Sequence, residues 1–152
     1  MITHEEFIKK YNLKEGDYYQ QNEWLRILYL NDFKDIIRIK ELPSKIEFTN
    51  KCNTKIILRT KKIPSDVIFN NDGHMEVINV EEISENVIFN NNGDLLLGNL
   101  KDFNIGKLNK IHPSVKFTNN GCVYLYIELI RSQVKLFLII RDLLLFIMLK
   151  KF

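Results

Sequence analysis

A segment of about 20 residues recurs along the middle of the chain. Its most regular feature is a phenylalanine that returns after 21, 20 and 28 residues, at Phe48, Phe69, Phe89 and Phe117. Variants of Leu/Ile-Pro-Ser-x-Ile/Val-x precede each phenylalanine, and x-Asn-Asn/Asp-Gly follows three of the four. A unit this short cannot bury an apolar face alone, so neighbouring units must stack and share one core. The repeat therefore predicts a solenoid.

Each unit reads as a short strand ending near the phenylalanine, an Asn/Gly turn and a second alternating strand. Equivalent strands of stacked coils lie about 4.8 Å apart and can pair into parallel sheets. Asn and Gly suit the turn because they tolerate positive φ. A β-hairpin array is the competing interpretation, because a strand, Asn-Gly and a strand also form the hairpin signal. The regular 20-residue period favours the solenoid.

Composition supports a mainly β fold within a single domain spanning 1–152. The 152 residues include 21 Ile and 17 Asn but no Ala, the best helix former. Residues encoded by A/T-rich codons dominate the composition, so we infer that the chain comes from an organism with an AT-rich genome. The repeats span 24–130 as about four and a half units, and the long last interval predicts an insertion near 103–110.

Both ends of a solenoid need cover, and the sequence predicts helices for that purpose. In the N-terminal cap and connector, residues 1–23, Thr3 and Glu6 form a capping box that opens a short helix to about Tyr11. At the C-terminus, residues 131–152 are expected to form an apolar capping helix. That run is interrupted by Lys135, Arg141 and Asp142, so no transmembrane span is predicted.

The start of the chain, its two cysteines and its C-terminal segment carry expectations about cellular location and oligomeric state. The polar start of the chain is no secretory leader, so we expect a cytoplasmic protein of a bacterial host. Cys52 and Cys122 fall three rungs apart, roughly 14 Å, whereas a disulfide needs Cα atoms within about 7 Å. They are expected to be free thiols. The chain is expected to be a monomer, or a dimer through the C-terminal helix.

No catalytic or metal-binding pattern stands out. His4, His74 and His112 are scattered, no Cys-x-x-Cys occurs, and no phosphate-binding glycine loop is present. Acidic residues vary from turn to turn, which argues against a repeated calcium site. We therefore predict no enzyme activity, no metal and no cofactor.

A protein-binding row has better support. If the residues at Phe+6 and Phe+8 point inward, the alternating positions of the second strand point outward. Apolar and aromatic groups on a regular outer surface suggest recognition. The predicted partner-binding residues are Tyr29, Ile57, Glu76, Ile78, Leu96, Tyr124 and Tyr126. The alternative is that the end segments or the insertion cover them.

Two further hypotheses use other features. Basic residues on adjacent rungs could follow a nucleic-acid backbone, with RNA as the partner, through Lys55, Arg59, Lys61 and Lys62. A net charge of only +3 excludes a strongly polybasic binder. The C-terminal segment with Lys150 and Lys151 could instead serve a structural or membrane-surface component.

The repeat resembles short leucine-rich-repeat-like β-solenoid proteins of phages and mobile elements in AT-rich bacteria. The resemblance covers 24–130 and departs from the usual consensus, because phenylalanines dominate the core and no Leu-x-x-Leu-x-Leu-x-x-Asn string is present. It therefore implies a flat β-solenoid rather than a horseshoe with outer helices. For a small protein of this type, we expect a non-enzymatic inhibitor of a host or defence protein, resembling an anti-CRISPR in its role.

Overall fold

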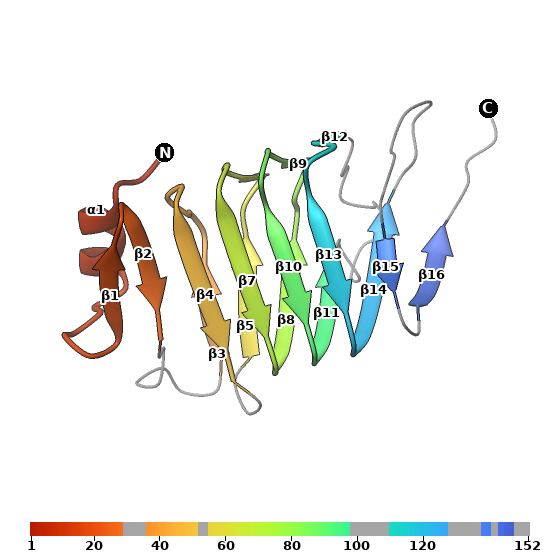
Figure 1. Cartoon of the computed structure of the whole chain (residues 1–152), viewed down its shortest axis with the longest axis horizontal. Helices are drawn as coiled ribbons and strands as arrows, with labels where there is room; N and C mark the ends of the chain where they lie inside the picture. The colour runs from red at the N-terminus through yellow and green to blue at the C-terminus, as the bar shows by residue number, and fades with distance from the viewer. Residues whose placement is uncertain (29–35, 52–54, 98–109, 128–137, 141–142, 148–152) are drawn as a thin grey trace.

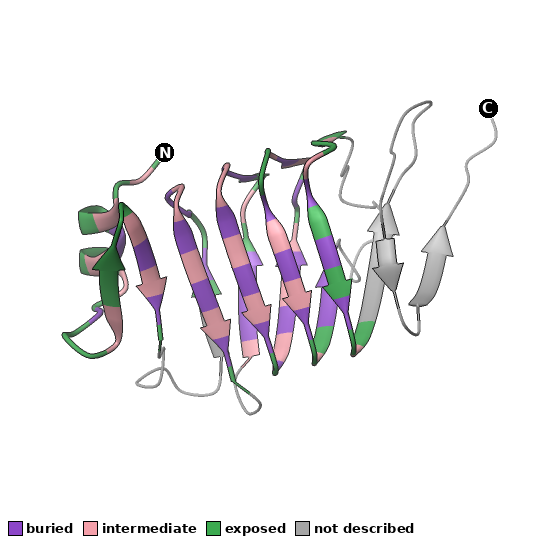
Figure 2. Ribbon diagram, in the orientation of Figure 1, coloured by how far each residue is buried: buried purple, intermediate pink, exposed green. Residues whose placement is uncertain are grey.

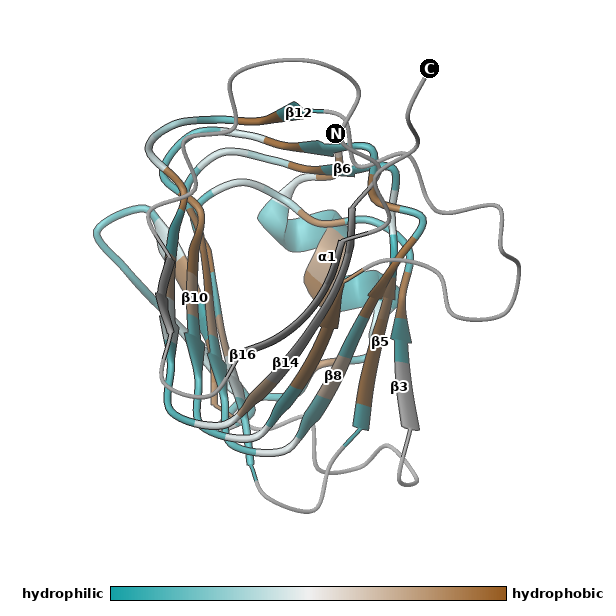
Figure 3. Cartoon of the chain, turned by 90° about the vertical axis from the view of Figure 1, so that its right-hand side faces the viewer, coloured by the Kyte–Doolittle hydropathy of each residue, from teal (hydrophilic) through white to brown (hydrophobic). Residues whose placement is uncertain are grey.

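The computed structural model describes residues 1–28, 36–51, 55–97, 110–127, 138–140 and 143–147. Its side chains are described through Cys122, apart from those at 36 and 37. The chain winds into a β-solenoid whose rungs follow one another along the long axis (Figure 1). Seen along that axis, the strands lie on three sides of the coil (Figure 3).

Sheet A contains seven strands and carries the repeated phenylalanines. In spatial order they are β1 (Tyr18–Gln21), β2 (Trp24–Ile27), β4 (Ile46–Asn50), β7 (Val67–Asn71), β10 (Ile88–Asn91), β13 (Lys116–Asn119) and β15 (Leu138–Ile140). The pairs are parallel except β1 with β2, which is antiparallel. Parallel pairing of equivalent strands is the arrangement that the 20-residue repeat predicts, and it rules out the hairpin alternative for these rungs.

Sheet B collects the strands that follow the turns. Their spatial order is β16 (Leu143–Ile147), β14 (Cys122–Ile127), β11 (Asp94–Leu97), β8 (His74–Ile78), β5 (Lys55–Arg59) and β3 (Ile36–Ile39). The short sheet C closes the third side with β12 (Lys110–Ile111), β9 (Glu82–Ile83) and β6 (Lys62–Ile63). The sequence predicts two strands per unit, and this third strand is an addition to that prediction.

The phenylalanines form a continuous stack inside the coil. Phe48, Phe69, Phe89 and Phe117 are paired in register, and their ring centroids lie 5.8, 5.0 and 4.7 Å apart with nearly parallel planes. In-register pairing places identical side chains one strand spacing apart, which is within the range of stacked aromatic rings. The repeat of one residue type thus selects the strand register.

A column of buried asparagines runs beside the phenylalanines. The side-chain amide of Asn50 donates to Asn71 Oδ1, that of Asn71 to Asn91 Oδ1, and that of Asn91 to Asn119 Oδ1, each at 2.7 Å. The amides of Asn71 and Asn91 also donate to the carbonyls of Gly73 and Gly93, at 3.2 and 2.8 Å. Buried amides need such partners. The column therefore links neighbouring rungs and also bonds the turn within the rungs of Asn71 and Asn91.

The turn glycines are explained by space rather than by positive φ. A Cβ at Gly93 would lie 2.1 Å from the carbonyl oxygen of Gly73, and one at Gly121 equally close to that of Gly93. Left-handed φ values near 55° occur instead at the opposite corner, at Lys45, Asp66 and Asn86. The predicted reason for these glycines was therefore wrong, although the turns lie where the sequence places them.

At the N-terminal end, the helix α1 (His4–Lys10) has the predicted capping box. Thr3 Oγ1 accepts from the Glu6 backbone N–H, and the Glu6 carboxylate accepts from that of Thr3. Phe7 is fully buried, and its ring meets Phe48 edge-on with centroids 5.9 Å apart. The capping role of this helix on the first rung stays a prediction, and the variant Phe7→Ala can test it.

The C-terminal segment corrects the expected helix over 131–152. Its described residues are strands, with β15 paired to β13 and β16 paired to β14. A run of Leu, Ile and Phe suits a strand, and pairing satisfies backbone groups that a helix would leave open at the edges of both sheets. The strand pairing therefore extends beyond the predicted end at 130, and the predicted dimer helix is absent from 138–140 and 143–147. Lys135, Arg141, Lys150 and Lys151 lie outside the described residues.

Two further predictions concern cysteines and membranes. Cys122 is a free, exposed thiol, whereas Cys52 lies outside the described residues. Within the part of the chain that the structure describes, no helix is long and apolar enough to cross a membrane.

Candidate binding surfaces

The outer face of sheet A is a regular surface made by side chains that alternate with the buried phenylalanines and asparagines. Burial alternates along β4, β7 and β10 (Figure 2), so the residues on either side of each phenylalanine face outward. We call this surface the sheet A face. It comprises Tyr19, Trp24, Arg26, Glu47, Thr49, Ile68, Asn70, Ile88, Asn90, Lys116 and Thr118.

Aromatic and cationic groups gather at the N-terminal end of the sheet A face. Tyr19 pairs with Arg26 across the β1–β2 hairpin, and the guanidinium carbon lies 5.9 Å from the ring centroid. Arg26 Nη1 also forms an ion pair with Glu47 Oε2 at 2.5 Å. Tyr19 is exposed and Trp24 is half-buried. Tyr, Trp and Arg are the residue types enriched at binding hot spots.

The middle of the sheet A face is held in place by hydrogen bonds between rungs. Asn90 Nδ2 donates to Asn70 Oδ1 at 2.9 Å, and Asn70 Nδ2 donates to Glu47 Oε1 at the same distance. Beside them, Ile68 and Ile88 are paired in register and half-buried. The result is a regular surface in which apolar and amide groups alternate and the Glu47 charge is already paired.

The predicted partner-binding row lies on the outer side of sheet B. Strand pairing aligns Ile57, Glu76, Leu96 and Tyr124, one residue per rung, and places Ile78 opposite Arg59. Ile57 and Leu96 are 7% and 6% exposed, although they do not belong to the interior core. Tyr29 and the side chains of Tyr124 and Tyr126 lie outside the described residues. The structure thus aligns the row but does not expose its two central apolar residues.

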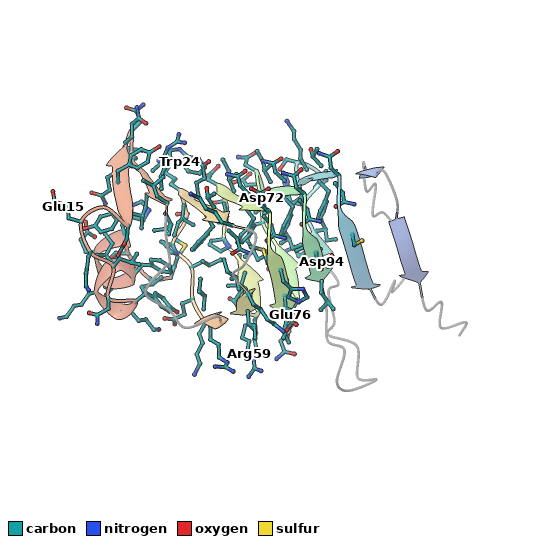
Figure 4. All side chains as sticks on the ribbon, turned by 90° about the horizontal axis from the view of Figure 1, so that it is seen from below. Glu15, Trp24, Arg59, Asp72, Glu76 and Asp94 are labelled. Atoms are coloured by element: carbon teal, nitrogen blue, oxygen red, sulfur yellow. The ribbon has the colours of Figure 1, made fainter. Side chains whose placement is uncertain are left out.

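Charges dominate the rest of this sheet B surface. Glu76 Oε1 lies 2.6 Å from Lys55 Nζ and 3.0 Å from His74 Nε2, and His74 Nδ1 lies 3.8 Å from Asp94 Oδ2. Burial raises the pKa of the Glu76 carboxyl, but hydrogen bonds from Lys55 and His74 outweigh it and hold that pKa below its ordinary value. The two faces are opposite sides of the coil: Trp24 points to one side and Arg59 and Glu76 to the other (Figure 4).

The predicted basic string is only partly available to a polyanion. Lys55 is paired with Glu76, and Lys62 Nζ lies 3.0 Å from Glu82 Oε1. The hydrogen bond from Lys62 holds the pKa of Glu82 below its ordinary value. Arg59 and Lys61 are exposed. Two of the four cations are therefore engaged with carboxylates on the next rung, which weakens the electrostatic case for RNA.

Sheet C and the corner beside it form an open hollow of about 470 Å³. Equivalent positions of three rungs place Lys62, Glu82 and Lys110 along it, with Glu82 Oε1 between the two ammonium groups at 3.0 and 3.8 Å. Ser84 and His112 line it as well. Its charges alternate in sign, so the hollow lacks the uniform field that would attract one kind of ion.

The three histidines remain apart. His4 Nε2 contacts the Ser44 carbonyl and His112 Nδ1 contacts Ser114 Oγ, both at 2.8 Å, while His74 lies in the charged cluster on sheet B. Across the described ranges, no group of three or more His, Cys, Asp and Glu side chains could hold a metal ion.

The sheet A face was missed by the sequence analysis, although its signal is visible in the repeat. The positions directly before and after each phenylalanine must face outward if the phenylalanine faces inward. They read Glu-Thr, Ile-Asn, Ile-Asn and Lys-Thr in the four units. The predicted row uses only the strand after the turn, so it does not include these positions.

The comparisons with known proteins found no matching family model, no matching curated protein and no matching solved structure.

Proposed function

We propose that this chain is a protein-binding module without catalytic activity, and that the sheet A face is its recognition surface. The observation that carries the proposal is the composition of that face. It combines Tyr19, Trp24 and Arg26 with the half-buried Ile68 and Ile88 on a regular, hydrogen-bonded sheet.

Interface anatomy favours sheet A over sheet B. Protein interfaces have cores depleted in charge and enriched in aromatic residues and arginine. On the sheet A face, Arg26 and Glu47 neutralise each other. Sheet B instead gathers Lys55, His74, Glu76 and Asp94 in one cluster, so more charged groups would have to be desolvated there, and Ile57 and Leu96 offer little exposed surface. Burying such charges costs free energy unless a partner compensates for them.

The filled interior supports a surface-binding role. Stacked rings and bonded amides occupy the centre of the described rungs. A ligand therefore has to be recognised from outside. A solenoid suits that task because successive rungs repeat one geometry and present an extended surface.

The repeat also motivates a narrower proposal about the class of partner. The repeat resembles those of phages and mobile elements, which motivates an inhibitor of a bacterial host or defence protein, resembling an anti-CRISPR in its role, in the cytoplasm. This narrower proposal depends on the identity of the captured protein.

The test is affinity capture from host lysate with and without nuclease, using a variant that changes the sheet A face and leaves the interior intact. In Ile68→Lys/Ile88→Glu, the two outward isoleucines become an opposite-charge pair on adjacent strands, which sheets tolerate. The matched control is Ile78→Glu, which changes one outward isoleucine on sheet B beside Arg59. We expect a stoichiometric protein to bind the wild type and Ile78→Glu, and to be lost from the double variant.

Other outcomes redirect the proposal. A partner that persists on the double variant and is lost with Ile78→Glu would move recognition to the predicted row on sheet B. Recovery that collapses with nuclease would instead favour RNA, and Arg59→Glu with Lys61→Glu would then abolish it, because these two cations are exposed. Circular dichroism of each variant confirms that the fold is retained.

A further inference from the structure

A second column of polar side chains runs along the outside of the turns. Asn92 Nδ2 donates to Asp72 Oδ1 at 2.8 Å, and Asn120 Nδ2 donates to Asn92 Oδ1 at 3.1 Å. All three residues are exposed, and each directly precedes a glycine. Asp72 lies along the edge where sheet A turns into sheet B (Figure 4). We call these residues the outer turn column.

Asn-Gly is the dipeptide in which an asparagine side chain is most open to attack by the backbone. Glycine has no Cβ, so its amide nitrogen can approach the neighbouring side-chain carbonyl. The glycine nitrogen forms a bond to the asparagine Cγ and loses its proton, while the bond from Cγ to the side-chain nitrogen breaks and ammonia leaves. Water then opens the cyclic imide at either carbonyl, which yields aspartate or isoaspartate. No oxidant or reductant is needed.

This sequence contains two Asn-Gly pairs, Asn92-Gly93 and Asn120-Gly121, and both belong to the outer turn column. Their local chemistry is therefore the same. Any difference between them in the folded chain must come from how firmly each side chain and each glycine nitrogen is held.

Asn92-Gly93 is held on both sides. The Asn92 amide donates to Asp72 and its oxygen accepts from Asn120, so rotation of the side chain breaks two hydrogen bonds. The attacking nitrogen is engaged as well, because the Gly93 N–H donates to the backbone carbonyl of Asn71 at 3.1 Å. Cyclisation here requires the turn to open.

Asn120-Gly121 differs in how its glycine nitrogen is held. The Asn120 amide donates to Asn92, at the longer distance of 3.1 Å. The Gly121 N–H donates to the side-chain oxygen of Asn119 at 3.3 Å, instead of to a backbone carbonyl. Among the described residues, freeing the nitrogen of Gly121 breaks a bond to a side chain, whereas freeing that of Gly93 breaks a bond to the backbone.

We propose that Asn120 is a site of spontaneous hydrolytic deamidation in the folded chain, and that the outer turn column protects Asn92 from the same reaction. A carboxylate at position 120 would face Asn92 Oδ1, another acceptor, so the hydrogen bond between these rungs is lost. Asp72 avoids this conflict because Asn92 donates to it. The modification adds negative charge next to the end of β13.

The experiment is an incubation of the full chain in mildly alkaline buffer, followed by peptide mapping with mass spectrometry in ¹⁸O-labelled water. In the native chain, Asn120 should deamidate faster than Asn92 by about five-fold, the factor that corresponds to one neutral hydrogen bond. In urea the two rates should become nearly equal, because the local sequences present the same Asn-Gly pair. Asn120→Gln should abolish the main modified peptide.

Asp72→Ala provides the sharper test, because it removes the acceptor for the Asn92 amide. It should raise the rate at Asn92 towards that at Asn120. The matched control is Asp66→Ala, which removes the acceptor for the Asn86 amide at the opposite corner and should leave both rates unchanged. Equal rates at Asn92 and Asn120 in the native chain, or an Asn92 rate unaffected by Asp72→Ala, would overturn the proposal.

Discussion

The inner and outer faces of sheet A are made by the same strands but follow different rules. Inside, the neighbouring strands β4, β7, β10 and β13 have phenylalanine in one column and asparagine in the other, from Phe48 and Asn50 to Phe117 and Asn119. Outside, the neighbouring positions change from Glu47 to Ile68, Ile88 and Lys116. Identity is required where rings and amides bond to their own kind on the next rung. On the outer face Asn70 and Asn90 bond to their own kind, but the position before each phenylalanine is free of that constraint and can carry recognition.

The largest expected effect comes from breaking the inner face in the middle of the stack. Phe89→Ala removes a ring that is 1% exposed and stacks on both neighbours. It should lower the free energy of unfolding by about 4 kcal/mol, the usual cost of deleting a buried aromatic ring. Urea unfolding followed by circular dichroism measures this loss. The adjacent outward Ile88→Ala should cost under about 1 kcal/mol, and equal losses would contradict the distinction between the two faces.

The end of the stack offers the next comparison. Phe7→Ala deletes the fully buried ring that meets Phe48 edge-on, and should cost about 3 kcal/mol. If α1 caps the first rung, amide hydrogen exchange should accelerate in β2 and β4 before β10. Uniform exchange along the solenoid, or unchanged stability, would mean that the helix is not a cap. Ile8→Ala, at a half-buried position of the same helix, is the control.

The asparagine columns test polar groups rather than rings. Asn71→Ala leaves the Asn50 amide and Asn91 Oδ1 without their bonds to residue 71, and should destabilise the chain by about 2 kcal/mol because both groups are buried. Asn70→Ala removes amide bonds on the half-buried outer face and should cost about 0.5 kcal/mol. Thermal unfolding of the two variants compares them directly, and a reversed order would refute the assignment of inner and outer columns.

The smallest expected effect on the free energy of unfolding comes from the ion pairs of sheet B, and it should depend on pH. The pKa of Glu76 is lowered in the folded chain, so its contribution to stability is present above the ordinary carboxyl pKa and is lost as the pH falls through the lowered value. Glu76→Gln should therefore reduce stability near neutral pH by about 0.5 kcal/mol and match the wild type in acid. Parallel urea titrations across this range test it, and a constant difference between the two proteins would argue against the ion pair.

The sequence predicts those parts of the fold that depend on repeated identity. Phenylalanines at regular intervals indicate stacked parallel rungs, and the capping box at Thr3 and Glu6 indicates the helix. Other features depend on contacts between rungs. Position 93 needs glycine because a Cβ there would collide with the carbonyl oxygen of Gly73 on the preceding rung. The sequence of one unit does not reveal this contact between two units.

The C-terminus and the binding surface show why a local reading has limits. A long apolar run fits a helix or strands equally well by composition, and the open edges of β13 and β14 favour strands here. The predicted row on sheet B follows from alternation alone. Alternation does not reveal that Ile57 and Leu96 are buried on the outer side, nor that Glu76 is already paired.

Photo-crosslinking from single positions shows which face of the solenoid contacts the partner. A photoreactive amino acid replaces the outward Ile88 on sheet A in one protein and the outward Ile78 on sheet B in another, and each is irradiated in nuclease-treated host lysate. Both positions are half-buried isoleucines on adjacent rungs, so the two probes are matched. If the sheet A face binds the partner, one protein is crosslinked from position 88 and none from position 78. Crosslinking of a protein from position 78 alone would contradict it.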